Sequence, residues 1–259
     1  MQIDLHPAVN IVLVGCGGTG GYLVPKLARL LMTLKEFKAS TQYQLTIVDP
    51  DIVEEANLYR QNFVQTDLGK NKAHVMANRY GRHFGIDIGS CAEKIETPER
   101  LKEFFLLPRN DGISWWPKST CVLIGCVDNN TARQVMHEMY IKWDGFGYGH
   151  NLVYIDSGNG KYTGQIVTGY REVNKLILPP VGEVYPDSLV EDEEEAPRNC
   201  TRNALENPQN IGANDLASTL VFSVLNILLT EGEINSHILT FDGRKQEFLS
   251  RAQLLTKIA

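Results

Sequence analysis

Short apolar runs recur along the first two thirds of the chain, and they alternate with segments of helical periodicity. The runs are typical of buried β-strands and predict strands at residues 11–14, 45–48, 86–95, 121–124 and 152–155. Between them, apolar residues recur every three or four positions, which predicts helices at residues 21–34, 73–84, 98–105 and 131–143. Strands that alternate with helices favour a parallel sheet with right-handed crossovers.

The pattern changes after residue 156. Residues 164–170 and 239–241 predict two further strands, and residues 213–229 predict an apolar helix that packs on the sheet. A long polar stretch, residues 179–210, lies between them and contains the acidic run 191–195. We interpret this stretch as a solvated crossover loop, since loops of this length are uncommon inside a compact domain.

These elements predict an α/β fold with a doubly wound, Rossmann-like, mostly parallel sheet, a C-terminal antiparallel extension and a long crossover loop. We expect a single domain over residues 1–259. Residues 9–170 would form a nucleotide-binding core, residues 179–210 the crossover loop, and residues 211–259 a helix and strand that complete the sheet.

Prolines mark two local features. Pro25 falls inside the first predicted helix, where a missing N–H should kink the helix or adjust its first turns. Thr97 is followed by Pro98, which predicts a helix N-cap with proline at the first helical position.

The composition is that of an ordinary soluble globular protein, with 43% hydrophobic and 22% charged residues over 259 positions. A formal net charge of −6 argues against a nucleic-acid groove. No apolar run approaches the roughly 20 residues of a membrane span, and the N-terminus lacks a signal-peptide pattern. We therefore expect a cytoplasmic protein with neither nucleic acid nor membrane as a partner.

Five cysteines occur without a Cys-x-x-Cys pair, so neither a disulfide framework nor a zinc ribbon is indicated. Cys91, Cys121 and Cys126 lie in or next to apolar runs and suit buried, inert thiols. Cys200 lies in a polar segment with an arginine two residues away on each side, which would favour the thiolate.

A glycine-rich turn, Gly-Cys-Gly-Gly-Thr-Gly at residues 15–20, joins the first predicted strand to the first predicted helix. Glycines let the backbone approach a phosphate, and the amides of a helix N-terminus then donate to it. Gly15, Gly17, Gly18 and Gly20 are therefore candidate nucleotide-binding residues. Asp49 ends the second strand, where a carboxylate can accept hydrogen bonds from a ribose. These features alone suit NAD or FAD as well as ATP.

The segment from residue 49 to 61, Asp-Pro-Asp-Ile-Val-Glu-Glu-Ala-Asn-Leu-Tyr-Arg-Gln, resembles the D-x-D-x-V-x-x-S/A-N-L-x-R-Q signature of the ThiF/MoeB/HesA superfamily. These proteins are bacterial relatives of ubiquitin-activating enzymes. Lys72 is similar to the lysine of the family's G-x-x-K-A element, and residues 128–133 resemble its D-N-x-x-x-R element. The resemblance covers roughly residues 9–170 well and residues 207–229 more loosely, and three ordered motifs are far more specific than one. The short chain is also similar to the ThiF-related proteins of the ParB-related/ThiF-related cassette.

The resemblance implies that ATP activates the C-terminal glycine carboxylate of a ubiquitin-like or sulfur-carrier protein as an acyl-adenylate. An α-carboxyl has a pKa of about 3.3 to 3.7, so the nucleophile is already ionised and needs no general base. The requirement is electrostatic, and Arg60 and Lys72 suit the neutralisation of the departing pyrophosphate. Asp128 would hold Mg²⁺ against the phosphates.

The resemblance implies further nucleotide-binding roles around the same loop. Asp51 belongs to the implied set, and Asn57 would either donate to a phosphate or order the loop. Simpler roles stay open at this point: Arg60 and Lys72 could be surface cations, and Asp128 could cap the helix that starts near residue 129.

Cys200 lies where ubiquitin-activating enzymes and ThiF-like proteins carry a cysteine that takes the acyl group, whereas MoeB-like members work without one. Both alternatives stay open.

The sequence also departs from its relatives: it lacks the paired Cys-x-x-Cys motifs, so no structural zinc is expected. Its N-terminus is too short for the arm that reaches a neighbouring subunit in MoeB-like dimers, so an arginine supplied by the partner of an expected homodimer is unidentified. Trp115 and Trp116 lie in an apparent insertion and suit either a partner site or packing on their own domain.

Two other classes of function compete with adenylation. An NAD(P)- or FAD-dependent Rossmann oxidoreductase would explain the glycine turn and Asp49, but it leaves Arg60, Lys72 and Asp128 without roles. A non-catalytic binding subunit should lack those cations and the magnesium ligand. The sequence therefore favours an adenylyltransferase.

Overall fold

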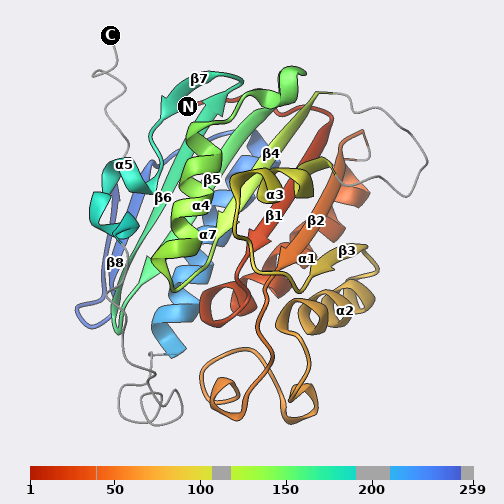
Figure 1. The fold of residues 1–259 in the computed structure, drawn as a ribbon, viewed down its shortest axis with the longest axis vertical. Coiled ribbons are helices and arrows are strands. Elements are labelled where there is room, and N and C mark those ends of the chain that lie inside the picture. Colours follow the sequence, from red (N-terminus) through yellow and green to blue (C-terminus); the bar gives the residue numbers. More distant parts are fainter. Residues whose placement is uncertain (39, 107–117, 191–210, 252–259) are drawn as a thin grey trace.

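The computed structural model describes residues 1–38, 40–106, 118–190 and 211–251. Its centre is a nine-stranded sheet in the order β3-β2-β1-β4-β5-β6-β8-β9, with β7 paired to β6 (Figure 1). The pairs from β3 to β5 are parallel, whereas the pairs from β5 onward are antiparallel. This arrangement confirms the predicted fold class.

The strands are β1 (Ala8–Val14), β2 (Gln42–Val48), β3 (Ile88–Cys91), β4 (Ser119–Gly125), β5 (Asn151–Asn159), β6 (Thr163–Glu172), β7 (Lys175–Leu178), β8 (Ile238–Asp242) and β9 (Glu247–Arg251). The α-helices are α1 (Gly18–Phe37), α2 (Lys72–Phe84), α3 (Pro98–Glu103), α4 (Asn130–Ile141), α5 (Val181–Val184) and α7 (Ile211–Glu231). Short 3-10 helices occur at Glu55–Asn57, Gln65–Asp67, Phe104–Leu106, Gly145–Gly147 and Pro186–Leu189.

Helices cover both faces of the parallel strands, which explains why those strands are continuous apolar runs. In β1, Ile11 and Leu13 belong to one core cluster, together with buried residues of α1, α2 and α7. Val12 and Val14 belong to a second cluster, with buried residues of α3 and α4. Figure 1 shows α4 in front of the sheet and α7 behind it. The alternation of side chains along each strand thus builds two cores from one run of sequence.

The first helix continues through Pro25 without interruption. Proline cannot donate to the carbonyl oxygen four residues earlier, which belongs to Gly21. The side-chain amide of Asn62 donates to that oxygen instead, at 3.1 Å. The expected disturbance is therefore compensated by a hydrogen bond from the loop that precedes α2.

Several predicted boundaries differ from the structure. The strand predicted at residues 86–95 shrinks to β3, because Glu93 and Lys94 leave the sheet and line a cavity. The strand β9 was not predicted, since all five of its residues are exposed and carry no burial pattern. The region predicted as a loop over residues 179–210 begins with α5 and the 3-10 helix Pro186–Leu189.

The helix α7 is the one helix within the described ranges that is long and apolar enough to cross a membrane. This finding differs from the expectation that no apolar run approaches that length. One such helix is weak support for a membrane segment, because core helices of soluble proteins pass the same test. Here α7 packs against α1 and against β5 and β6, and its buried residues belong to the first core cluster.

A buried polar cluster lies at the amino end of β4. His150 is 1% exposed, and its Nδ1 atom accepts a hydrogen bond from the backbone N–H of Ser119 at 2.7 Å. The Nε2 atom is buried without a hydrogen-bond partner in the described part of the chain. Burial lowers the pKa of His150, and it also lowers the pKa values of His137 and His237.

We expect the free energy of unfolding to fall as the pH drops below about 6.5, the pKa of a solvated histidine. The folded protein holds these three histidines neutral at a lower pKa, so the unfolded chain binds more protons in that window. Urea unfolding at a series of pH values measures the slope. His150→Gln keeps an acceptor for Ser119 and should reduce the slope, whereas an unchanged slope in this variant would exclude His150 as a contributor.

Candidate functional site

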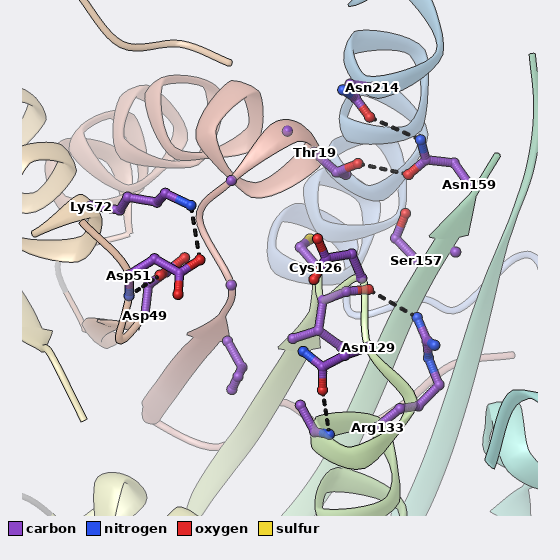
Figure 2. A pocket seen from close by; sticks show the side chains of 18 of the residues that line it. Thr19, Asp49, Asp51, Lys72, Cys126, Asn129, Arg133, Ser157, Asn159 and Asn214 are labelled. Carbon is purple, nitrogen blue, oxygen red and sulfur yellow. Dashed lines mark hydrogen bonds and ion pairs between the residues drawn. The ribbon is translucent and has the colours of Figure 1, made fainter. Parts of the chain in front are cut away.

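A cavity of about 730 Å³ opens at the carboxyl ends of the parallel strands. It lies where the chain order reverses, because β1 connects to β2 on one side and pairs with β4 on the other. Ligands of open α/β sheets bind at such a point. Figure 2 shows side chains from the ends of β2, β4 and β5 and from α1, α2 and α7 around this space.

The glycine turn forms one wall of the cavity. Gly15 has a φ of +85°, and a Cβ atom there would lie 2.6 Å from the carbonyl oxygen of Cys126. Gly17 and Gly18 line the cavity at the start of α1, and no side chain caps this helix. Its first amides are therefore available to an anion. Gly20 is absent from the lining, and its role is close packing of the helix against the turn.

Gly20→Ala should destabilise the protein by at least about 1–3 kcal/mol, the usual cost of overpacking. A Cβ atom at Gly20 would lie 2.0 Å from the carbonyl oxygen of Gly15, and backbone cannot move aside as a flexible side chain can. Differential scanning calorimetry measures the change. Gly160→Ala is the matched control, since its nearest atoms would lie 4.0 Å away. Equal melting temperatures for the two variants would contradict the packing argument.

Asp49 fastens the glycine turn to the loop after β2. Its carboxylate accepts hydrogen bonds from the backbone N–H groups of Cys16, at 2.7 Å, and Asp51, at 2.9 Å. Burial raises its pKa, and these hydrogen bonds and nearby Lys72 oppose the rise. Asp49 also lines the cavity, so the same carboxylate shapes the turn and faces the space that a ribose would occupy.

Lys72 is the first residue of α2 and lines the same cavity. Its ammonium group lies 2.9 Å from a carboxylate oxygen of Asp51 (Figure 2). The side chain of Lys72 is only 8% exposed, whereas that of Asp51 is 64% exposed. The alternative that Lys72 is a surface cation is therefore wrong.

Arg60 also lines the cavity, and its Nε atom is buried without a hydrogen-bond partner within the described ranges. The neighbouring Asn57 is buried and absent from the lining, and its side-chain oxygen accepts from the backbone N–H of Glu54 at 2.9 Å. Of the two roles considered for Asn57, this contact favours the ordering of the loop.

Asp128 is exposed and lines the cavity beside the start of α4. The helix cap is Asn129, whose side-chain oxygen accepts from the N–H of Ala132 at 2.8 Å, so Asp128 is free of that role. Arg133 holds the loop in place by donating to the carbonyl oxygen of Val127 at 3.1 Å. Its Nε atom donates to both carboxylate oxygens of the buried Asp156, each at 3.1 Å.

The structure adds polar residues that were not predicted for the site. They line the same cavity as Arg60 and Lys72 and comprise Thr19, Ser157, Asn159, Thr163, Gln165 and Asn214. Ser157 and Asn159 could have been found from the sequence, because they follow the fifth predicted strand, residues 152–155, closely, and ligands bind at the carboxyl ends of parallel strands. Nothing in the sequence pattern marks Asn214, which α7 brings to the cavity.

Cys200, Trp115 and Trp116 lie outside the described residues. Two other cysteines match the expectation of inert thiols, because burial raises the pKa of Cys121 to about 12 and raises that of Cys126 as well. Among the described residues, no group of three or more His, Cys, Asp or Glu side chains could hold a metal ion.

A family model described as the ThiF family matches residues 3–257. Among solved structures, PaaA is 16% identical, with a TM-score of 0.61 over 94% of this chain and 64% of that chain. Escherichia coli MccB with ATP is 16% identical, with a TM-score of 0.61 over 96% of this chain and 64% of that chain. MccB in complex with N-formylated MccA is 17% identical, with a TM-score of 0.58 over 94% and 64%.

At such low sequence identities, the structural similarity shows a shared fold and nothing more. The present chain spans less than two thirds of the length of these neighbours. No curated protein matches the chain.

Proposed function

Since this chain belongs to the ThiF family, we propose that it is an ATP-dependent adenylyltransferase that activates the C-terminal carboxylate of a peptide or small protein. The observation that carries this proposal is Arg60, which lines the same cavity as the glycine turn and whose buried Nε atom has no hydrogen-bond partner within the described residues. A nicotinamide or flavin site gives neither Arg60 nor Lys72 a role, and the family match favours adenylation over that alternative.

The reaction needs charge neutralisation more than acid or base groups. A carboxylate oxygen of the substrate forms a bond to the α-phosphorus of ATP, and the bond from that phosphorus to the bridging oxygen breaks as pyrophosphate leaves. Amides at the start of α1 would hold phosphate oxygens, and Arg60 and Lys72 would neutralise the charge that builds on the leaving group. Lys72 is already held by its ion pair with Asp51, so little reorganisation of this cation accompanies the reaction.

Magnesium fits this site as a companion of ATP. Mg²⁺ is usually held by one or two carboxylates together with phosphate oxygens and water. Asp128, exposed at the edge of the cavity, would supply a carboxylate, and the ion would stabilise negative charge on the phosphates.

The acyl substrate we propose is a ubiquitin-like or sulfur-carrier protein that ends in glycine. A fold neighbour, MccB, has been solved in complex with N-formylated MccA, which supports a peptide or small protein as the class of partner. We further propose a cytoplasmic homodimer, which analytical ultracentrifugation would test.

Cys200 is the proposed acceptor for a second step. Its thiolate would attack the acyl-adenylate, forming a thioester and releasing AMP. A gel shift that disappears with thiol reductant and in Cys200→Ala would establish this step, and a wild-type enzyme without any such adduct would exclude it.

The experiment that tests adenylation is ATP–pyrophosphate exchange with Mg²⁺ and a panel of small proteins that end in glycine. We expect exchange that requires the small protein and is lost in Lys72→Ala, together with calorimetric binding of ATP. Absence of exchange with every small protein, combined with binding of NAD and none of ATP, would overturn the proposal in favour of the oxidoreductase.

A further inference from the structure

The cavity consists of two chemically different halves. Asp49, Asp51, Arg60, Lys72 and Asp128 supply charge on the side of β2, α2 and the loop after β4. The other side, formed by β5, β6 and the starts of α1 and α7, is lined mainly by uncharged polar side chains and by the glycines at positions 158 and 160, and its one charged neighbour among the described residues there is Arg133, which is paired with Asp156. A nucleoside triphosphate suits the charged half, so the neutral half is available to a second molecule.

A chain of hydrogen bonds fixes the orientation of the side chains in the neutral half. The hydroxyl of Thr19 donates to the side-chain oxygen of Asn159 at 3.0 Å. The side-chain amide of Asn159 then donates to the side-chain oxygen of Asn214 at 2.9 Å (Figure 2). Because the oxygen of Asn214 is used in this way, its Nδ2 atom must point elsewhere.

That Nδ2 atom lies against the glycine turn, since a Cβ atom at Gly18 would be only 2.6 Å from it. Asn214 is 1% exposed, and its Nδ2 atom has no hydrogen-bond partner in the described part of the chain. Ser157 is 2% exposed, and its hydroxyl is also without a partner there. Figure 2 shows both side chains in the neutral half of the cavity.

Buried donors without partners are rare in folded proteins, because each costs free energy that a bound acceptor would recover. Here the two residues that carry them line one cavity next to the first amides of α1, where the α-phosphate of ATP would lie in the proposed reaction. Both can donate to a carbonyl oxygen. An alkyl chain in the same place would leave both donors desolvated and unpaired, which is how polar sites reject apolar analogues.

We propose that Ser157 and Asn214 bind a main-chain carbonyl oxygen of the acyl substrate and thereby select a peptide over a simple carboxylic acid. Thr19 and Asn159 are positioning residues, because they orient the amide of Asn214 and need not touch the substrate. This inference rests on the proposed adenylation and names the part of the site that recognises the acyl group.

The test uses three 5′-sulfamoyl-adenosine conjugates, in which the sulfamoyl group stands in for the α-phosphate of the acyl-adenylate. Their acyl groups are glycyl, glycylglycyl and 5-aminopentanoyl. The last two have chains of equal length, and only glycylglycyl carries the internal amide. Isothermal titration calorimetry on the full chain should show glycylglycyl binding roughly tenfold to a hundredfold tighter than 5-aminopentanoyl, as expected for hydrogen bonds to buried donors.

Ser157→Ala and Asn214→Ala should each reduce this preference severalfold, and Ser157→Thr should retain it because the hydroxyl is kept. Asn159→Asp cannot donate to Asn214 and should weaken glycylglycyl binding while 5-aminopentanoyl binding changes little. Thr219→Val is the matched control, since Thr219 lies on the same helix as Asn214 but is exposed and absent from the cavity lining. Binding of AMP reports whether each variant is folded.

Equal affinities of the wild-type protein for glycylglycyl and 5-aminopentanoyl would overturn this inference and leave adenylation intact. A preference that survives in both alanine variants would also overturn it. If ATP and all three conjugates fail to bind the wild-type protein, the proposed adenylation fails first, and the inference fails with it.

Discussion

Arg60→Ala should lower the rate of ATP–pyrophosphate exchange by about 10²–10³, the usual effect of removing one fixed donor from a site where charge develops. Arg60 lines the cavity, and its buried Nε atom has no hydrogen-bond partner within the described ranges, so this donor is not used in a structural contact there. Its charge is therefore available to the phosphates. The exchange rate is measured at saturating concentrations of ATP and of the small protein, so that a slower reaction is distinguished from weaker binding.

Arg82→Ala is the matched control, because Arg82 is an exposed arginine on α2 and is absent from the cavity lining. It should leave the exchange rate unchanged, whereas Arg60→Lys should restore part of the loss, since lysine keeps the charge but not the fork of donors. An Arg60→Ala enzyme that exchanges at the wild-type rate would remove Arg60 from the mechanism.

The charged half of the site could be predicted from the sequence because its geometry is set locally. A glycine turn between a strand and a helix can be built in few ways. Glycine is required at positions 15 and 20, because a Cβ atom there would lie 2.6 Å and 2.0 Å, respectively, from a backbone oxygen. Asp49 follows a buried strand directly, and Lys72 begins the next helix. Such positions depend on short-range order, and the sequence motifs record that order.

The neutral half could not be predicted in the same way, because tertiary packing creates it. Asn159 and Asn214 are 55 positions apart and meet only because α7 packs beside β5. A polar residue at the start of an apolar helix is ordinarily a solvated one. The same limit applies to the cap of α4, where adjacent Asp128 and Asn129 are both good cap residues and only the backbone geometry selects Asn129.

Arg133→Met should destabilise the protein by about 3–5 kcal/mol, the cost of leaving one partner of a buried ion pair alone. The side chains of Arg133 and Asp156 are 9% and 1% exposed, so little solvent can replace the lost contact. Arg133 also donates to the carbonyl oxygen of Val127, next to Asp128. Loss of that bond should loosen the loop that carries Asp128 and reduce exchange as well. Urea unfolding and the exchange assay measure the two effects.

The pH dependence of this destabilisation identifies its cause. Burial raises the pKa of Asp156, and Arg133 opposes that rise, so Arg133→Met should raise this pKa further. When the folded-state pKa of a carboxyl lies above the unfolded value of about 3.9, the free energy of unfolding falls as the pH rises. The destabilisation caused by Arg133→Met should therefore be smaller at low pH. Arg100→Met, in an exposed ion pair with Glu103, should have far less effect at any pH. A destabilisation of equal size at all pH values would indicate that Arg133→Met acts through lost packing. If the double variant Arg133→Met/Asp156→Asn regains free energy of unfolding relative to Arg133→Met, the unpaired charge of Asp156 is the cause.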